Sequence, residues 1–510
     1  MWVHQARFPS PEYSTQFALL QITLATHPYS FFTSTPSKPA VDMLPKIRKV
    51  AVLGGGPSGV VAAKCLLSEG IVPVIFEQQP NFGGVWNYTP ETKSRLQHIP
   101  QEDPNLDDEP VPDSQGSRRP VFMNPIYSEL ETNIPKDLMV FNNTPFGERL
   151  QLFPTHEDTK LYVQGFSKGL ESYTKFNRKV TKLVRQAGLK WETETQDTVS
   201  AKTENEIFDA VVIATGHYNV PYIPPVYGIA EFERKYPGSI LHSKYFRVAD
   251  VYKGKRVVVV GNSASGIDIA GQISEVSQIP LYQSCRSADA SKDFPVLAPE
   301  KIKVVPTIEK FVPDDRTVVF SDGTTEKDID VILFCTGYLH SLPFLEESTE
   351  PSERMVTDGF YIHRLYQHIF YIPHPTLSIV GLPTKVIPFP FVETQAAVVA
   401  GVYSGRLSLP SEENMDTWGK DLLRTKAADR HFHFLNFPQD ADYMDMLNKW
   451  NREEGDGGKR IYQPSQWGEK ERWIRKNIPK IKAAFLVAKS EGRIVKTMGE
   501  LGFFYEGDAK

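Results

Sequence analysis

Three glycines, Gly54, Gly56 and Gly59, occur at the spacing G-x-G-x-x-G between an apolar run that ends at Leu53 and another that begins at Val60. This spacing is typical of a buried β-strand that turns sharply into a helix and binds the pyrophosphate of a dinucleotide. The first glycine permits the turn, the second lets the backbone approach the pyrophosphate, and the third lets the helix pack on the strand. The N–H groups of the helix N-terminus then face the negative charge, so we expect a dinucleotide site here.

An acidic residue, Glu77, ends the next apolar run, which begins at Val72. Its distance from the glycine turn suits the acid that accepts hydrogen bonds from the ribose hydroxyls of a bound dinucleotide. A glycine motif alone is weak evidence, but here strand, glycines, helix, strand and acid occur in the expected order. The alternative, an incidental glycine turn, would require all these agreements to be coincidences.

A second strand, turn and helix are predicted from the sequence Lys-Arg-Val-Val-Val-Val-Gly-Asn-Ser-Ala-Ser-Gly between Lys255 and Gly266. Ser263 replaces the second glycine, but its backbone can still approach a pyrophosphate and its hydroxyl can donate a hydrogen bond. The strand that follows ends in a cation, Arg286, where the first site has its acid. This favours a 2′-phosphate, and hence NADP over NAD, with a solvated surface arginine as the alternative.

Length and composition indicate a large soluble protein. The 510 residues suggest about three domains. Basic and acidic residues nearly balance, 57 against 62, so we expect no nucleic-acid partner. We find no apolar stretch of transmembrane length. The three cysteines, Cys65, Cys285 and Cys335, form neither a metal-ligand cluster nor the closely spaced redox pair of a flavin disulfide reductase. They favour a reducing compartment, and no metal is expected.

Residues 1–45 are rich in Ser, Thr and Pro and contain one short apolar patch, Phe17–Leu24. We expect a disordered extension or a start codon assigned too early, since Met43 precedes the first strand by only a few residues. A targeting segment is the alternative, although its apolar part is short for a signal peptide.

Two further motifs carry a resemblance to a known family. The run Gly83-Gly84-Val85-Trp86 looks like the Gly-Gly-x-Trp element of flavin-containing monooxygenases. The segment Tyr236–Phe246 is similar to the F-x-G-x-x-x-H-x-x-x-[YF] pattern of that family, with Tyr236 in place of the leading Phe. Baeyer–Villiger monooxygenases carry Trp at the last position, so Phe246 favours oxygenation of a heteroatom over insertion into a ketone. We expect His242 to orient the domains and not to transfer a proton.

Two similar runs, Phe208–His217 and Ile329–Tyr338, resemble the strand-to-linker crossings of two-dinucleotide flavoproteins. The resemblance therefore implies an α/β fold with two Rossmann-like dinucleotide-binding domains. An FAD-binding domain would comprise residues 46–220 and 339–510, the latter including C-terminal helices. An inserted NADPH-binding domain would comprise residues 221–338.

Local patterns complete the expected organisation. Residues 89–120 are rich in Pro and Asp and predict a surface loop, and the alternation over Phe176–Asp209 predicts a small antiparallel meander. A basic amphipathic stretch from Trp467 to Val487 predicts a packed C-terminal helix, with a membrane-surface helix as the alternative.

The resemblance also implies which residues contact the cofactors. Glu393–Ala400 is expected to form a helix whose N-terminus points at the flavin ring. Asn133 is expected beside the flavin as the one catalytic residue, with a helix N-cap before Pro135 as the alternative. The residues expected to contact FAD are Gly54, Gly55, Gly56, Pro57, Ser58, Gly59, Glu77, Gly84, Val85, Trp86, Thr132, Asn133 and Gln395. Those expected to contact NADPH are Gly261, Asn262, Ser263, Ala264, Ser265 and Arg286.

The activity that the resemblance implies is that of an N,N-dimethylaniline monooxygenase. NADPH would reduce FAD, the reduced flavin would add O₂ as a C4a-hydroperoxide, and a soft nucleophile, an amine nitrogen or a thiol or sulfide sulfur, would attack its distal oxygen. The alternatives are a Baeyer–Villiger enzyme, and an NADPH oxidase or non-catalytic flavin-binding protein. The expected partners are a small-molecule nucleophile and O₂, with a homodimer as one option for assembly. We expect a cytoplasmic protein, with loose association with the endoplasmic reticulum surface as the alternative.

Overall fold

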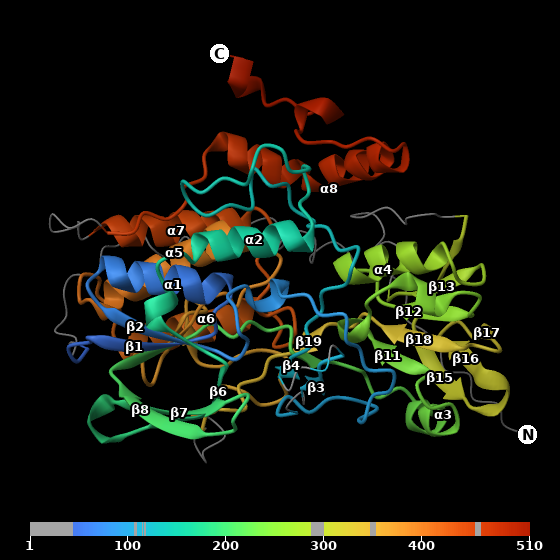
Figure 1. Cartoon of the computed structure of the whole chain (residues 1–510), viewed down its shortest axis with the longest axis horizontal. Coiled ribbons are helices and arrows are strands. Elements are labelled where there is room, and N and C mark those ends of the chain that lie inside the picture. The colour runs from blue at the N-terminus through green and yellow to red at the C-terminus, as the bar shows by residue number, and fades with distance from the viewer. Residues whose placement is uncertain are drawn as a thin grey trace, which may run out of the picture.

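The structure is a computed structural model that describes residues 44–106, 110–114, 116, 119–286, 300–346, 353–453 and 461–509. The predicted extension over residues 1–45 lies outside this part, except for Leu44 and Pro45. Two largely parallel sheets lie side by side, each flanked by helices (Figure 1). We call the part built around the seven-stranded sheet the first unit, and the part built around the five-stranded sheet the second unit.

The sheet of the first unit has β1 near its centre and strands far apart in sequence beside it. Its parallel strands are β1 (Lys49–Leu53), β2 (Val72–Glu77), β5 (Thr174–Phe176), β9 (Ala210–Ile213) and β22 (Leu377–Ile379), and its antiparallel edge is β20 (Leu365–Tyr366) with β21 (Phe370–Tyr371). Because β22 follows the whole second unit in the chain, the first unit is completed only by its C-terminal part.

Both faces of β1 are buried, as expected for a central parallel strand. Val50 and Val52 pack among residues of α1 (Pro57–Ser68) and α5 (Pro388–Tyr403). Ala51 and Leu53 face the opposite side and pack with Trp191 and Phe208 of the predicted meander. That meander is confirmed as a three-stranded antiparallel sheet of β6 (Arg178–Arg185), β7 (Trp191–Asp197) and β8 (Thr203–Phe208).

The second unit repeats this arrangement with a smaller sheet. Its strands are all parallel and run in the order β11 (Ile240–His242), β18 (Val331–Phe334), β12 (Val257–Val260), β13 (Leu281–Ser284) and β14 (Ile302–Val305). On one face Val257 and Val259 pack on α4 (Ala264–Ser274). The other face is covered by α3 (Ile229–Lys235) and by the antiparallel strands β15 (Ile308–Val312), β16 (Thr317–Phe320) and β17 (Thr325–Glu326).

The two chain crossings between the units lie side by side. β10 (Val220–Pro221) on the first crossing pairs antiparallel with β19 (Tyr338–Leu339) on the second. The segment Tyr236–Phe246 holds both crossings: the buried Lys244 ammonium donates to the Asn219 carbonyl at 2.6 Å, and His242 Nε2 donates to the Gly337 carbonyl at 3.0 Å. His242 Nδ1 accepts the Lys244 N–H at 3.1 Å, which places the ring proton on Nε2.

The segment predicted as a surface loop over residues 89–120 is irregular and mostly exposed, which confirms that expectation, but a few of its side chains anchor it to the second unit. Leu96 and the nearby Met123 lie in the core of the second unit beside Phe232 and Val258. The segment also contains a short antiparallel pair, β3 (Val111–Pro112) and β4 (Pro120–Val121). Its apolar residues are too widely spaced to form a local pattern, and only the contact with the second unit explains their burial.

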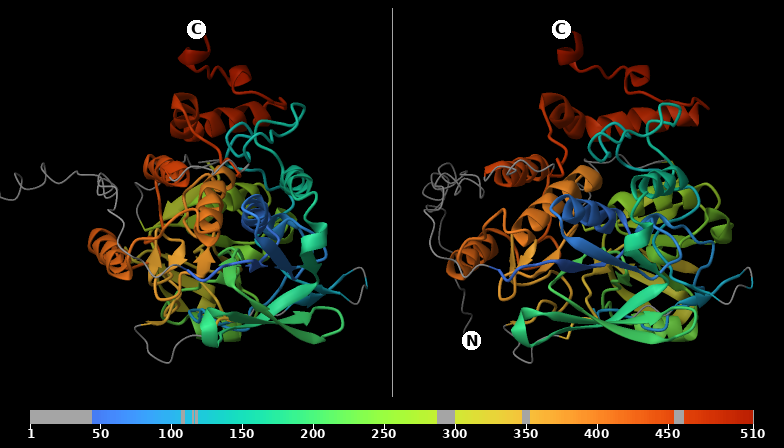
Figure 2. Two further views of the ribbon diagram at one scale, coloured as in Figure 1. Left: turned by 90° about the vertical axis from the view of Figure 1, so that its left-hand side faces the viewer. Right: turned by 60° about the vertical axis from the view of Figure 1, so that its left-hand side comes forward.

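Helices lie above the first sheet in more than one layer and beside its antiparallel edge (Figure 1 and Figure 2). They are α1, α2 (His156–Phe166), α5, α6 (Glu412–Thr425), α7 (Gln439–Glu453) and α8 (Glu469–Ser490). The predicted packed C-terminal helix is α8, which buries Ile474, Ile478, Ile481 and Phe485 along one side. The chain beyond α8 projects outward to the C-terminus (Figure 2). Helix α5 begins at Pro388, five residues before the predicted start, because its two early prolines occupy first-turn positions that need no N–H partner.

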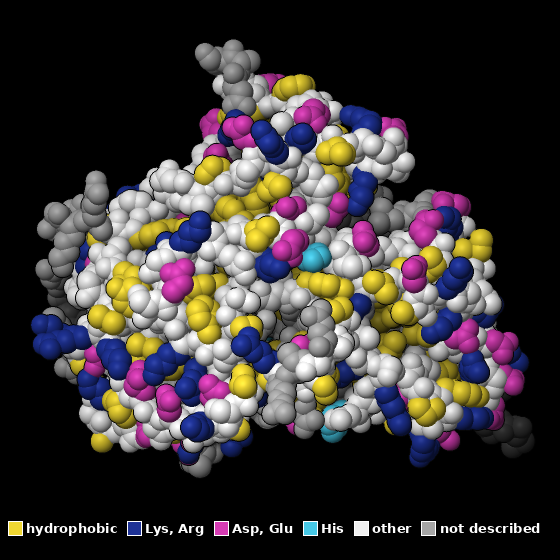
Figure 3. Space-filling model, in the orientation of Figure 1, with side chains coloured by type: hydrophobic (Ala, Val, Ile, Leu, Met, Phe, Trp, Pro, Cys, Tyr) yellow, Lys and Arg dark blue, Asp and Glu magenta, His cyan; other side chains and the backbone are white. Residues whose placement is uncertain are grey.

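Charged side chains of both signs are interspersed among the described residues of the face shown in Figure 3. This face therefore lacks the broad basic surface that binds nucleic acid. None of the described helices has both the length and the apolar character needed to span a membrane.

The burial of His242 predicts a pH-dependent stability. Burial lowers its pKa to about 3, whereas an unfolded histidine titrates near about 6.5. Below that pH the unfolded state binds the extra proton and the folded state does not, so His242 alone lowers the free energy of unfolding by about 2 kcal/mol as the pH drops from 7 to 5. Urea unfolding of the wild type and of His242→Gln at both pH values measures this. The variant should lose about 2 kcal/mol less than the wild type, and equal losses would contradict the assigned neutral state.

Candidate functional site

The first glycine turn joins β1 to α1 at the carboxyl ends of parallel strands. The Gly54 N–H donates to the Phe76 carbonyl at 2.8 Å, and the φ of Gly54 is +111°. A Cβ on Gly54 would lie 2.6 Å from the Ala214 oxygen, and a Cβ on Gly59 would lie 1.8 Å from the Gly54 oxygen. Strand, turn and helix therefore touch so closely that only glycine fits at these two positions.

The second turn, between β12 and α4, has the same backbone geometry. The Gly261 N–H donates to the Ser284 carbonyl at 2.8 Å, and its φ is +118°. A Cβ there would lie 2.7 Å from the Cys335 oxygen, and one on Gly266 would lie 2.3 Å from the Gly261 oxygen. The chain thus contains two equivalent turns that can each accept a dinucleotide pyrophosphate.

Three helices, two of which follow these turns, have unusual N-termini. Helices α1, α4 and α5 begin without a side-chain cap and without an acidic residue in the first turn. The other described helices of at least eight residues differ: α2 and α6 carry Thr155 and Ser411 caps, and α7 and α8 have acidic first turns. The partial positive charge and N–H groups of three helix ends therefore remain available to a ligand.

Glu77 braces the first turn. Its Oε2 accepts the Gly55 N–H at 2.7 Å and its Oε1 accepts the Gln79 N–H at 2.8 Å. Burial raises its pKa to about 7, although both backbone hydrogen bonds favour the charged form. A carboxylate has about four acceptor positions, so each oxygen retains capacity for a ribose hydroxyl.

The Gly-Gly-x-Trp element lies directly against the first turn. The Gly83 N–H donates to the Gly55 carbonyl at 3.2 Å, and a Cβ on Gly84 would lie 2.7 Å from the Gly56 Cα. Gly84–Trp86 form a short 3-10 helix whose Trp86 packs on the core of the first unit. Because Gly56 has no side chain, the backbone of Gly84 can come close to it, and the same space lets a pyrophosphate approach as expected.

The α5 residue predicted to contact FAD is engaged by the protein itself. Gln395 is fully buried, accepts the Gly381 N–H at 2.8 Å and donates to the Tyr443 hydroxyl at 3.1 Å. Gly381 in turn packs against Ser58 of α1, because a Cβ on Gly381 would lie 2.5 Å from the Ser58 Oγ. Gln395 therefore holds the chain after β22 against the first turn.

The Thr132–Asn133 segment is held by α8. The Lys482 ammonium donates to the Thr132 carbonyl at 2.9 Å, and burial lowers the pKa of Lys482 to about 8. Asn133 is exposed and its amide makes no hydrogen bond within the described part of the chain. The N-cap alternative for Asn133 is wrong, because residues 134–139 form turns and not a helix. Sequence analysis missed Lys482, whose one signal is a basic residue beside the apolar stripe of α8.

A second missed residue, Tyr127, links the two units. It is 4 % exposed, its ring packs against Phe246 at 5.2 Å, and its hydroxyl donates to Asp268 on α4. Burial raises the pKa of Asp268, so this carboxyl depends on the tyrosine as a partner. The last residue of the Tyr236–Phe246 segment thus packs on the chain that leads to Asn133.

Polar groups on the crossings line a recess between the carboxyl ends of β9 and β22. His217 and Ser341 border a cavity of about 20 Å³ there, and neither His217 ring nitrogen nor the Ser341 hydroxyl has a partner among the described residues. Burial lowers the pKa of His217 to about 4. The neighbouring Tyr218 is partly surrounded by protein, which raises its pKa by desolvation. Even so, 48 % of the residue's surface is accessible to solvent. A space of this volume holds about one water molecule, which would supply the missing contacts.

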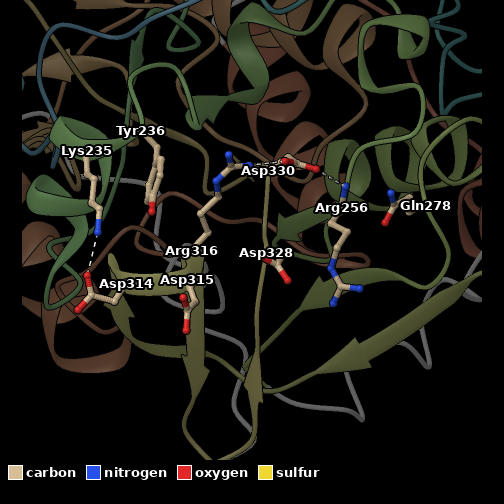
Figure 4. Close-up of a pocket in the computed structure, with 9 residues that line it drawn as sticks. All are labelled: Lys235, Tyr236, Arg256, Gln278, Asp314, Asp315, Arg316, Asp328 and Asp330. Atoms are coloured by element: carbon tan, nitrogen blue, oxygen red, sulfur yellow. Dashed lines mark hydrogen bonds and ion pairs between the residues drawn. The ribbon is translucent and has the colours of Figure 1, made fainter.

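A larger cavity, about 760 Å³, lies elsewhere on the second unit and does not include either turn (Figure 4). Its cations are already paired, since Lys235 contacts Asp314 at 2.8 Å and Arg316 contacts Asp330 at 2.6 Å. We therefore place the functional site at the turns and not in this cavity. The described residues contain no group of His, Cys, Asp and Glu side chains arranged to hold a metal ion.

A family model described as "Flavin-binding monooxygenase-like" matches residues 47–100, 121–288 and 293–452, which include both turns and both crossings. The chain belongs to this family. This confirms the predicted family, the two-dinucleotide α/β fold, and FAD and NADPH as the cofactors.

Relatives of this flavin-binding monooxygenase-like chain cover most of its length. It is 35 % identical over 434 residues to flavin-containing monooxygenase FMO GS-OX-like 9 of Arabidopsis thaliana, which is 78 % of this chain and 89 % of that relative. Among solved structures, S-allyl-L-cysteine S-oxygenase from Allium sativum is 30 % identical with a TM-score of 0.70, covering 86 % of this chain and 94 % of the other. Tmm from Pelagibacter sp. strain HTCC7211 is 28 % identical with a TM-score of 0.65, covering 86 % and 90 %.

The contact between Gly84 and Gly56 yields a test of the first turn. Gly84→Ala adds a Cβ 2.7 Å from the Gly56 Cα at a φ of +55°, so the turn must shift and most FAD should be lost. The flavin-to-protein absorbance ratio after purification measures this. Gly165→Ala on α2 is the matched control, because that glycine is exposed and nothing lies within 4 Å of the added Cβ. Equal flavin content in both variants would show that FAD binding does not depend on this turn.

Proposed function

We propose that this monooxygenase uses NADPH and O₂ to oxygenate a soft nucleophile, and that a sulfide sulfur is its preferred acceptor. The observation that carries the proposal is the likeness to the Allium sativum S-oxygenase, which extends over 86 % of the chain and so includes both units. An amine nitrogen is the other soft nucleophile that the fold could serve, and the experiment below distinguishes the two.

We assign FAD to the first turn and NADPH to the second. The first turn offers Glu77, which has acceptor capacity for a ribose, and the uncapped N-termini of α1 and α5. The second offers the uncapped N-terminus of α4. The corresponding domains are residues 46–220 with 339–510 for FAD, and 221–338 for NADPH.

Arg286 is the proposed reader of the NADPH 2′-phosphate. It is exposed and lies two residues after the end of β13. Cys285, the residue before it, occupies the position that corresponds to Glu77 in the first unit. Burial, and to a smaller extent the nearby charge of Arg286, lower the pKa of Arg430. Two cations that approach each other in this way favour a phosphate ligand, and a guanidinium can bind it through paired hydrogen bonds.

The protein's part in the reaction is to hold and enclose its cofactors. FAD, once reduced by NADPH, supplies the activated oxygen. Two histidines on the crossings, His217 and His340, are largely shielded from water by protein. Burial lowers their pKa values to about 4 and about 3, so both side chains are neutral. Neutral histidines at these positions cannot protonate a substrate amine, and Asn133 is the proposed contact to the flavin.

The experiment that tests this function offers a thioether, S-allyl-L-cysteine, an amine, N,N-dimethylaniline, and a ketone, cyclohexanone, to the FAD-loaded protein with NADPH under labelled ¹⁸O₂. We expect fastest turnover with the thioether and one labelled oxygen in its sulfoxide. A faster amine reaction would reassign the acceptor. A labelled ester from the ketone would establish Baeyer–Villiger activity, and hydrogen peroxide as the sole product would establish an oxidase.

Asn133 has a separate test of its proposed place beside the flavin. Asn133→Ala should retain FAD and still oxidise NADPH, but release most electrons as hydrogen peroxide, because the reactive oxygen is no longer shielded from water. The ratio of product formed to NADPH consumed measures this coupling. Glu129→Ala, an exposed position on the same segment, should leave the ratio unchanged. A normal ratio in Asn133→Ala would exclude a catalytic role.

A further inference from the structure

Asn133 lies at a bend whose shape is set by the residue before it, Thr132. Thr132 is 3 % exposed, its N–H donates to the Pro154 carbonyl at 2.9 Å, and its hydroxyl donates to the Ile134 carbonyl at 2.9 Å. Its carbonyl accepts the Lys482 ammonium of α8 at 2.9 Å. All three polar groups of Thr132 are therefore engaged, and the direction in which the chain enters Asn133 follows from them.

The Lys482 ammonium has two aromatic neighbours in addition to this carbonyl. It lies 4.4 Å from the ring centroid of Phe153 and 5.2 Å from that of Phe485. The ring faces attract a cation and the carbonyl accepts its hydrogen bond, so these groups offset part of the cost of removing the charge from water. Moving the Thr132 carbonyl away would leave the ammonium with less compensation, and this cost fixes the carbonyl in place.

Charged groups from three parts of the chain act on Lys482. They are Glu131, Asp268 on α4 and Lys489 on α8. Burial lowers the pKa of Lys482 to about 8, while the two carboxylates raise it and Lys489 lowers it. Both carboxylates have other partners, since Glu131 accepts from Lys489 at 2.9 Å and Asp268 accepts from the Tyr127 hydroxyl. Neutral pH therefore keeps the ammonium charged, whereas mildly alkaline pH removes its charge.

The segment that carries Asn133 is tied at both ends to elements outside the first sheet. At one end Tyr127 donates to Asp268 of α4, and at the other end Thr132 accepts from Lys482 of α8. Helix α8 begins after residue 452, where the match to the family model ends. The place of Asn133 thus depends on a helix outside the matched part of the chain.

We propose that Lys482 is a positioning residue for the oxygenation: it fixes the Thr132 carbonyl and thereby sets where Asn133 lies relative to the flavin. This proposal rests on the proposed contact between Asn133 and the flavin. It adds that a charged hydrogen bond from α8 maintains the contact, and that loss of this bond uncouples NADPH oxidation from product formation.

Hydrogen exchange of the FAD-loaded protein, without NADPH, tests the structural half of the proposal. Lys482→Met keeps an unbranched side chain but removes the charge and the donors. Amides of residues 128–134 should exchange roughly 10- to 100-fold faster in this variant, because a charged hydrogen bond contributes that much to local stability. Lys480→Met, at an exposed lysine of the same helix, is the matched control and should leave these rates unchanged. Unchanged exchange in Lys482→Met would overturn the proposal.

The ratio of product formed to NADPH consumed tests the consequence for the reaction. Lys482→Met should lower this ratio several-fold and release hydrogen peroxide, whereas Lys482→Arg, which keeps a charged donor, should restore most of it. Adding Lys482→Met to Asn133→Ala should lower the ratio no further than Asn133→Ala does alone, because the lysine acts through the asparagine. A further fall in the double variant would contradict the positioning role.

The wild-type protein offers a test that does not depend on a variant's folding. Since the pKa of Lys482 is about 8, its ammonium loses its proton between about pH 7 and about pH 9, and the ratio should fall over this range. Lys482→Arg stays protonated, so its ratio should remain level. A level ratio in the wild type, or an equal fall in both proteins, would rule out control by the lysine.

Asn133→Ala separates this proposal from the one on which it rests. If Asn133→Ala is uncoupled but Lys482→Met is not, Asn133 contacts the flavin and Lys482 does not position it. If exchange is faster in Lys482→Met while both variants stay coupled, the lysine holds the segment, but the assignment of Asn133 to the flavin is wrong and the positioning role fails with it.

Discussion

The relative position of the two units depends on a short run of hydrogen bonds made by buried polar residues. Lys244 donates to Asn219 on one crossing, and His242 donates to Gly337 on the other. Both side chains are fully buried, so each would lose a hydrogen bond that offsets its desolvation if its crossing moved. The segment therefore acts as a fixed brace, and the distance between the two nucleotide turns follows from it. A histidine kept neutral by its surroundings suits this purpose, because it can donate from one nitrogen and accept at the other.

The two turns share one backbone geometry but differ in what surrounds them. At the first, Gly84 presses against Gly56 and Glu77 braces Gly55, so backbone and carboxylate from the same unit enclose the site. At the second, Ser263 meets a lysine from the other unit. One turn is thus built within a single sheet, whereas the other is completed across an interface. This difference suits one cofactor that stays bound through many turnovers and another that must enter and leave.

The sequence predicted those parts of the fold that local patterns determine. The glycine turns, the central strands and the meander lie where apolar periodicity and glycine spacing place them, because the physics there acts between near neighbours in the chain. The burial of Leu96, the ties made by Lys482 and the two protein partners of Gln395 could not be predicted, since each depends on residues far away in the sequence. The start of α5 was missed for another reason: Pro388 and Pro390 suggest a loop unless the helix is known to begin there.

Tyr127 also constrains the order in which the chain can reach its native state. Its ring belongs to the core of the second unit, although it is synthesised before any strand of that unit. Conversely, β22 enters the first sheet only after the second unit has been made. Neither core can be completed from a contiguous stretch of chain. During synthesis the early strands therefore remain only partly assembled. Their apolar surface is covered only after the last third of the chain has been made. The two units have separate sheets, but neither is a domain that could fold by itself.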